Sequence, residues 1–300
     1  MYKFHAQAGR NLLCRLSYAN ASSQYHIFAA LGYEPSPARY DRRSITPQLR
    51  PAYELLMTQT GEGDYYFLVF AIGLADSQET YQIQFDYVDQ YVVSLSPTQG
   101  GNLGDVTLSL EGSLFQSGVE VRLAGPGGTA ISAYEILVPD STKLHARMNL
   151  RGAPIGSYNL EVKWPGGIAQ STFENAFQVT PGIGPRLEAE LLAPNAIRPG
   201  RTYTLLIRYQ NTGDADLTAP VLLLQSEADI PLGLDPDAPL EKKPVRFLAV
   251  PREGPAGILV PGAQGSITVY FQSGAANRIS FRLEAIQDLN SLVTWDAPEW

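Results

Sequence analysis

The amino-acid sequence predicts an all-β protein built from three tandem β-sandwich domains. Its 300 residues suffice for two to three ordinary domains. Only 17% of the residues are charged, whereas roughly 25% is usual in globular chains. Glycine (27), proline (22) and tyrosine (16) are abundant, and these residues favour turns and strands over long helices. The hydrophobic share of 44% excludes a disordered chain and can form a core in each domain.

The net charge and the cysteine content exclude several classes of function. A formal net charge of −8 and a pI near 5.0 argue against a nucleic-acid partner and against an anionic membrane surface. The sequence lacks an apolar run of the roughly 20 residues that a membrane-spanning helix needs, so we expect no membrane insertion. The single cysteine, Cys14, permits no intramolecular disulfide. Its place between leucines predicts a buried packing residue.

The first predicted domain covers residues 1–90. Alternating or densely apolar segments predict its strands, at 2–6, 12–17, 65–71 and 81–87. The run 65–71 is apolar throughout, which predicts a fully buried central strand. Residues 34–52 are polar and proline-rich and include Arg39, Arg42 and Arg43, which predicts a long surface loop.

The order of these segments resembles the bacterial pre-peptidase C-terminal (PPC) domain, a jelly-roll-like β-sandwich of secreted proteins. The resemblance rests on five segments in this order: Tyr2-Lys3-Phe4, Ala8-Gly9, Leu12-Leu13, Gly63-Asp64-Tyr65-Tyr66-Phe67-Leu68-Val69 and Tyr81-Gln82-Ile83. PPC domains begin with one further strand, which this sequence lacks, so the resemblance implies an unpaired sheet edge at Tyr2 and Phe4. Another copy of the chain could donate the missing strand, and its apolar tail from Leu289 to Trp300 is a candidate donor.

The second predicted domain, residues 91–180, resembles the immunoglobulin-like IPT/TIG module. Its alternating strands are separated by turn residues at the spacing that a sandwich requires. The segments that carry the resemblance include Val106–Gly112, Gly156–Val162 and Asn175–Val179.

The third predicted domain, residues 186–300, follows a linker at 181–185 that two prolines stiffen. The segments 198–204 and 209–213 resemble the immunoglobulin-like CARDB modules related to bacterial cell adhesion. Residues 265–271 predict a strand of a final hairpin, and a C-terminal tail follows from Asp288 to Trp300.

The sequence indicates no catalytic centre, and we expect a protein that is not an enzyme. It contains no G-x-S-x-G, GxxxxGK[ST] or H-E-x-x-H motif. His5, His26 and His145 lie in or near strand-like segments, and none stands beside a nucleophile in the sequence. Together with one cysteine, these histidines cannot build a structural zinc site.

Two aspartate pairs are the candidate metal ligands. Asp214 and Asp216 lie in a turn after Gly213, and Asp235 and Asp237 flank a proline in a polar loop. Calcium takes about six to eight oxygen ligands, so either pair supplies only part of a site. The sequence therefore contains no full Ca²⁺ motif, and we expect no cofactor. Solvated turn carboxylates are the favoured interpretation.

Three tyrosines are candidate ligand contacts. Tyr33, Tyr40 and Tyr53 lie in or near the polar segment of the first domain. Exposed aromatic rings on β-sandwich modules can stack on sugar rings or contact protein partners. The alternative is that these rings pack within the domain, as aromatic residues of strands do.

These observations predict a non-catalytic structural or adhesive segment of a large exported bacterial protein, located outside the cell or at its surface. Arrays of these modules resemble parts of very large surface or secreted proteins, some with Rhs-type repeats. No signal peptide is visible, and we interpret Met1 as a cut in a longer chain rather than an expression start. A self-assembling fibre subunit and a carbohydrate-binding module are the alternatives. Expected partners are a cell-surface protein or glycan, or other copies of the chain.

Overall fold

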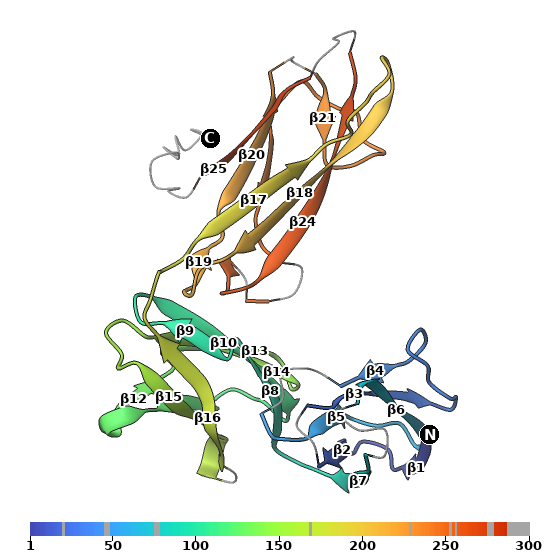
Figure 1. Ribbon diagram of the computed structural model, residues 1–300, viewed down its shortest axis with the longest axis vertical. Coiled ribbons are helices and arrows are strands. Elements are labelled where there is room, and N and C mark those ends of the chain that lie inside the picture. Colours follow the sequence, from blue (N-terminus) through green and yellow to red (C-terminus); the bar gives the residue numbers. More distant parts are fainter. Residues whose placement is uncertain are drawn as a thin grey trace, which may run out of the picture. The chain divides into compact units, whose positions relative to one another are not determined.

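The computed structural model describes residues 1–19, 22–44, 49–74, 79–167, 170–227, 230–251, 254–255, 257–274 and 279–286. Regular structure in these ranges is β-strand apart from two 3₁₀ turns, η1 (Pro126–Gly128) and η2 (Pro165–Gly167), which confirms the all-β fold. The chain divides into two compact units, 1–181 and 182–300 (Figure 1). The first unit contains two sandwiches and the second contains one.

The first sandwich packs a four-stranded sheet against a three-stranded sheet. The larger sheet has the order β1-β6-β3-β4, with bounds Tyr2–Ala6, Gly63–Gly73, Gln24–Leu31 and Arg42–Arg43. The smaller sheet has the order β5-β2-β7, with bounds Tyr53–Met57, Leu12–Tyr18 and Tyr81–Tyr87. The core between them includes Cys14, Ile27 and Phe67, all fully buried. The predicted packing role of Cys14 is confirmed, and burial raises the pKa of its thiol.

Strand β6 is central but not fully buried. It lies between β1 and β3, and Tyr65 and Phe67 are buried in it. In contrast, Phe70 and Ile72 are 42% and 52% exposed. The prediction of full burial is therefore wrong for this strand. The reason is that the other sheet of the sandwich covers only one face of β6.

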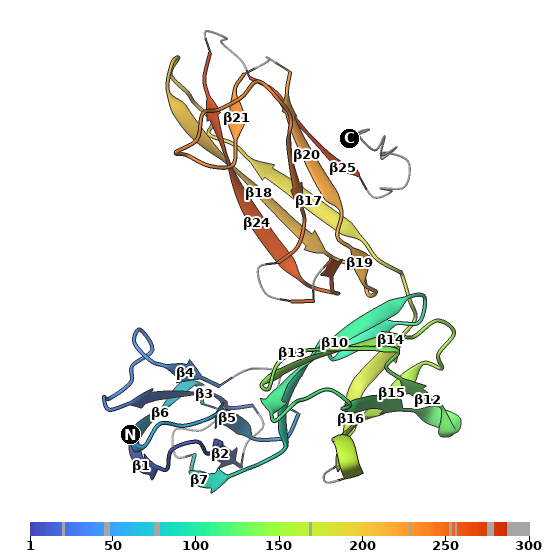
Figure 2. The ribbon, with the colours of Figure 1, turned by 180° about the vertical axis from the view of Figure 1, so that it is seen from behind.

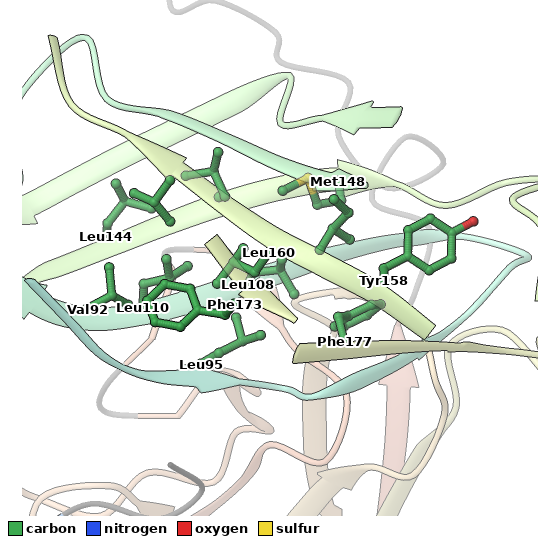
Figure 3. Close-up of a cluster of buried hydrophobic side chains, with 14 of the residues drawn as sticks. Val92, Leu95, Leu108, Leu110, Leu144, Met148, Tyr158, Leu160, Phe173 and Phe177 are labelled. Atoms are coloured by element: carbon green, nitrogen blue, oxygen red, sulfur yellow. The ribbon is translucent and has the colours of Figure 1, made fainter. Parts of the chain in front are cut away.

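The second sandwich packs a four-stranded sheet against a five-stranded sheet. The first has the order β13-β14-β10-β8, with bounds Glu135–Asp140, Lys143–Asn149, Asp105–Ser113 and Tyr91–Ser96. The second has the order β12-β11-β15-β16-β9, with bounds Ala130–Ser132, Glu120–Ala124, Gly156–Lys163, Gln170–Thr180 and Gln99–Gly101. Side chains from both sheets meet in one core, where Leu108, Tyr158 and Phe177 are buried (Figure 3). The three segments predicted as strands correspond to β10, β15 and β16.

The third sandwich contains a four-stranded and a three-stranded sheet (Figure 2). The larger sheet has the order β17-β18-β24-β21, with bounds Leu187–Leu192, Thr202–Asn211, Gln264–Gln272 and Leu232–Gly233. The smaller has the order β22-β20-β25, with bounds Val245–Leu248, Val221–Ser226 and Phe281–Ile286. A separate short pair joins β19 (Leu217–Thr218) to β23 (Ile258–Leu259).

The predicted final hairpin is wrong, because β24 and β25 belong to different sheets. Strand β24 pairs with β18, whereas β25 crosses the core and pairs with β20. From that position Phe281 packs edge-on against Phe271 of β24, with ring centroids 5.1 Å apart. The crossing lets β25 cover the core from the side opposite β24.

Candidate functional site

The first two sandwiches meet at a buried carboxylate, that of Glu54 on β5. Side chains alternate across a strand, so Glu54 points away from the first core, on the side of β5 opposite Leu55. Arg15 of β2 is its cross-strand partner and lies on the same side. Segment 49–50 and the start of β8 cover this side, and the Glu54 side chain is 0% exposed.

Four hydrogen bonds hold the Glu54 carboxylate and its partners together. Arg15 donates from Nε to Oε1 of Glu54 at 2.9 Å, and Arg50 donates from Nη1 to Oε2 at 3.0 Å. From the second sandwich, the Tyr91 hydroxyl donates to Oε1 at 2.6 Å. That hydroxyl also accepts a hydrogen bond from Nη2 of Arg15 at 2.8 Å. The carboxylate is thus shared between two arginines and the first strand of the second sandwich.

Arg15, Arg50, Glu54 and Tyr91 form a joint between the two sandwiches, and Arg50 extends this joint further into the second sandwich. Its Nη1 also donates to the Val92 carbonyl at 2.9 Å. Its guanidinium lies over the ring of Tyr91 at 4.3 Å and over that of Phe173 at 4.8 Å. A planar guanidinium suits this combination of stacking and hydrogen bonding, whereas the lysine ammonium does not.

The electrostatics of the joint follow from its burial. The hydrogen bond from Arg15 to Glu54 raises the pKa of the guanidinium above its usual range. Burial, followed by the bond to Glu54, raises the pKa of Tyr91 to about 12. Removing one partner from a buried ion pair costs about 3–5 kcal/mol, because the remaining charge is left without compensation. We therefore expect the joint to resist bending between the two sandwiches.

Sequence reasoning missed this site because its members lie far apart in the chain. Tyr91 and Arg15 stand 76 positions apart, and Tyr91 and Glu54 stand 37 apart. One local signal was available. Glu54 interrupts the otherwise apolar strand Tyr53–Met57, and a carboxylate in such a setting needs a specific partner when it is buried.

Two of the three candidate tyrosines lie in one ordered loop between β3 and β4. The Tyr33 hydroxyl donates to Oδ1 of Asp41 at 2.7 Å, and Arg39 lies 4.3 Å above the Tyr33 ring. Tyr40 is 38% exposed and packs on Phe28, with ring centroids 5.0 Å apart. The structure therefore brings Tyr33 and Tyr40 into a single loop beside Arg39.

The third candidate, Tyr53, lies apart from that loop. It belongs to β5, in the other sheet of the sandwich. Its ring contacts those of Tyr18 and Tyr25, with centroids 5.4 and 5.8 Å away. The side chain of Tyr53 thus contributes to aromatic packing at the end of the first core.

Two of the four candidate aspartates, Asp214 and Asp235, accept hydrogen bonds from the backbone. Asp214 accepts hydrogen bonds from the backbone N–H groups of Ile183 and Gly184, each at 2.8 Å. Oδ1 of Asp235 accepts from the backbone N–H of Asp237 at 2.9 Å, which forms an Asx turn. Asp216 follows Asp214 by two positions, before β19. Within the described ranges, no three Asp, Glu, His or Cys side chains gather as a metal site requires.

The three histidines lie in three separate settings. His5 is exposed and contacts Asp64, at 2.8 Å between Nδ1 and Oδ1. His26 lies in β3 against Phe28, and burial followed by the charge of Arg43 lowers its pKa. His145 is 9% exposed in β14, where Nδ1 lies 2.8 Å from Oγ of Ser109.

The predicted unpaired sheet edge, the candidate site of strand exchange, contains Tyr2 and Phe4. Both residues lie in β1, the end strand of the sheet β1-β6-β3-β4. Strand β1 pairs with β6 on one side, and within the described ranges no strand pairs with its other side. The two rings point into the first sandwich, where Phe4 stacks on Phe85 at 5.2 Å. The candidate donor, Leu289 to Trp300, lies outside the described residues.

Comparisons with known proteins yield similarities to solved structures. No protein-family model and no curated protein matches the chain. Native E. coli α2-macroglobulin is 9% identical, with a TM-score of 0.23, over 92% of this chain and 19% of that chain. A biofilm-associated protein BSP domain is 6% identical, with a TM-score of 0.24, over 95% of this chain and 58% of that one. The titin I9–I11 tandem is 12% identical, with a TM-score of 0.22, over 96% of each chain.

These similarities concern the β-sandwich fold alone. The chain spans about a fifth of the length of the E. coli protein and somewhat over half of the BSP-domain chain. Among the described residues, no helix has the length and apolar character that crossing a membrane requires.

Proposed function

We propose that the chain is a non-catalytic structural or adhesive segment of a large exported bacterial protein, in which the first two sandwiches form one rigid spacer. The buried joint at Glu54 carries this proposal. Domains that share only a short linker move relative to one another by default. Here, a bend that separated Tyr91 and Arg50 from their contacts would leave the buried Glu54 carboxylate with fewer partners, which is costly in a low-dielectric setting.

The finer assignments belong to the same proposal. We infer PPC-like, IPT/TIG-like and CARDB-like modules at 1–90, 91–180 and 186–300, and a location outside the cell or at its surface. The sequence segments that resemble these modules support the assignment, as does the sandwich architecture. A rigid spacer would hold a more distal part of the parent protein away from the cell.

Distance measurements between the two sandwiches test the spacer. Spin labels at Gln82→Cys and Ser117→Cys would occupy one exposed position in each sandwich, while the buried Cys14 would stay unlabelled. We expect a single narrow distance distribution, which Glu54→Ala broadens because the joint loses its central acceptor. Glu161→Ala is the matched control, since it removes a cross-strand ion pair with Arg122 within the second sandwich. A broad distribution in the unchanged chain would refute the rigid spacer.

A second candidate function is glycan recognition by the loop that carries Tyr33 and Tyr40. The geometry of this loop favours glycan recognition. Asp41 and Arg39 hold the Tyr33 side chain in place, and Tyr40 in the same loop is 38% exposed. We expect Tyr40→Ala to abolish retention on a polysaccharide array, while Tyr53→Phe leaves it unchanged. Failure of the unchanged chain to bind any glycan would remove this candidate.

Assembly into fibres by strand complementation is the remaining candidate, and the free side of β1 favours it. Light scattering over a concentration series, followed by negative-stain microscopy of the same fractions, tests it. Filaments are the expected outcome for a fibre subunit. A monomer at all concentrations, without filaments, would dispose of the idea.

A further inference from the structure

The third sandwich has an open seam between β17 and β25. These two strands end their respective sheets, and their inward-facing side chains line a groove on that side of the sandwich. All lining residues are apolar. They are Leu187, Ala189, Leu191, Leu222, Phe281, Leu283 and Ala285.

The groove exposes side chains that belong to the core. Leu222 at its floor is 0% exposed. Phe281 and Leu283 pack against the core cluster and yet are only half-buried, because none of the described strands covers their open side. Apolar surface of this kind is stabilised when a further element covers it, by about 25 cal/mol for each Å² removed from water.

The backbone of β25 adds a second, independent feature. Its residues pair with β20 on one side, from Phe281 opposite Ser226 to Ile286 opposite Val221. In the described part of the chain, no strand pairs with the other side of β25. A free strand edge beside an apolar groove is the geometry that accepts an added strand, whose backbone pairs with the edge while alternate side chains enter the groove.

We propose that this seam is a strand-binding groove and that its occupant is the C-terminal segment of the same chain, residues 291–297. The segment is Ser-Leu-Val-Thr-Trp-Asp-Ala and lies outside the described residues. In an extended conformation, Val293, Trp295 and Ala297 share one face, which enters the groove, and Leu292 and Thr294 share the other.

Chain length and connectivity select this occupant. Strand β25 ends at Ile286, and residues 287–291, Gln-Asp-Leu-Asn-Ser, have the length and the Asp and Asn content of a hairpin loop that ends on the first residue of the segment. With this loop, Val293, Trp295 and Ala297 stand opposite Ala285, Leu283 and Phe281, whose side chains line the groove. The six extended residues 292–297 span roughly 20 Å, which matches the length of the six-residue β25. A segment tied to β25 by so short a loop meets the groove at an effective concentration in the millimolar range, which favours it over the same segment of another molecule.

This inference is independent of the spacer role and bears on the fibre alternative. If residues 291–297 fill the seam of their own molecule, they are not available to complete the β1 edge of another copy. A fibre built from β1 would then need a different donor strand.

Hydrogen exchange of the full chain, read by mass spectrometry, tests the proposal. We expect the amides of 292–296 to exchange more than about tenfold more slowly than in the free peptide 288–300. Val293→Asp would abolish this protection, because it places a charge in the groove. The matched control Thr294→Asp would retain it, because that side chain faces away. The amides of β18 and β24 in the same spectra report whether the third sandwich stays folded.

Each outcome decides the matter. Unprotected amides at 292–296 in the unchanged chain, with β18 and β24 protected, would overturn the proposal, as would equal loss of protection in the two variants. Protection that accompanies a dimer in light scattering, and disappears on dilution to monomer, would show that another copy fills the seam and would overturn the assignment to the same molecule.

Discussion

The second and third sandwiches differ in how completely their sheets enclose the core. The second has sheets of four and five strands, and its core residues Phe177 and Trp164 are each 1% exposed. The third opposes four strands with three, and Phe281 and Leu283 remain half-buried at the seam. Among the described residues, a smaller sheet of three strands leaves apolar residues of the third core half-buried, whereas a smaller sheet of four strands encloses the second core.

Matched phenylalanine substitutions give the largest expected effect and test this comparison directly. Phe177→Ala should lower the free energy of unfolding by about 3–5 kcal/mol, because it leaves a cavity in an enclosed core. Phe281→Ala should cost about 1–2 kcal/mol if the seam is open, because the ring is then partly solvated, and should approach the Phe177→Ala loss if residues 291–297 cover the ring as proposed above. Chemical denaturation of the two variants measures both losses. Similar losses would indicate that a further segment covers Phe281, whereas a much smaller loss for Phe281→Ala would indicate an open seam and would count against the proposed occupant.

The hydrogen bond from Tyr91 of the second sandwich to Glu54 predicts that the folded protein loses stability at alkaline pH. Tyr91 ionises near 10 in the unfolded chain, whereas its pKa in the folded protein is raised to about 12. The folded state therefore retains the proton longer, and the resulting stability is present below pH 10 and is lost as the pH rises towards 12. We expect the free energy of unfolding to fall by on the order of 2 kcal/mol over this range, and we expect this loss to be absent in Tyr91→Phe. Chemical denaturation at several pH values between 9 and 12 measures the loss. An equal change in the free energy of unfolding in the two proteins would contradict this expectation.

Asp214 anchors the chain segment that enters the third sandwich. Asp214→Ala should cost about 1–2 kcal/mol, since two backbone N–H groups lose a charged acceptor. Asp237→Ala is the control, because that side chain is exposed and the turn bond uses its backbone N–H. Thermal melting with and without Ca²⁺ measures both variants. A large stabilisation by Ca²⁺ that Asp214→Ala removes would instead identify a metal ligand.

The smallest expected effect concerns acid stability of the second sandwich. Burial, and then the charge of Lys143, lowers the pKa of His145 below 6.5. The folded state favours the neutral imidazole, so the stability it contributes is present above pH 6.5 and is lost as the pH falls through the folded pKa. His145→Gln should flatten the decline of the melting temperature below pH 6.5. An unchanged slope would show that other groups cause the decline.

Local sequence patterns predicted much of the fold. The alternation at 106–112 and 156–162 identified β10 and β15, and leucines at alternate positions identified Cys14 as a core residue. These predictions succeeded because strand formation and the inward direction of alternate side chains depend on neighbouring residues.

Predictions that depended on distant residues succeeded less well. Residues 65–71 are apolar enough for burial on both faces, yet one face of β6 is left uncovered by the opposing sheet. Residues 265–271 form a strand as expected, yet the next strand crosses to the other sheet. In both cases, packing across the sandwich overrode a pattern that is correct within the strand.

By itself, the sequence determined the all-β class, the positions of most strands and the apolar character of their inward faces, because those properties follow from side-chain periodicity and turn chemistry. Only the tertiary structure decided that Glu54 is buried between two arginines and Tyr91, and that β17 and β25 flank an open groove. Those features arise where strands far apart in the chain meet, and the free energy of such contacts depends on partners that no local pattern specifies.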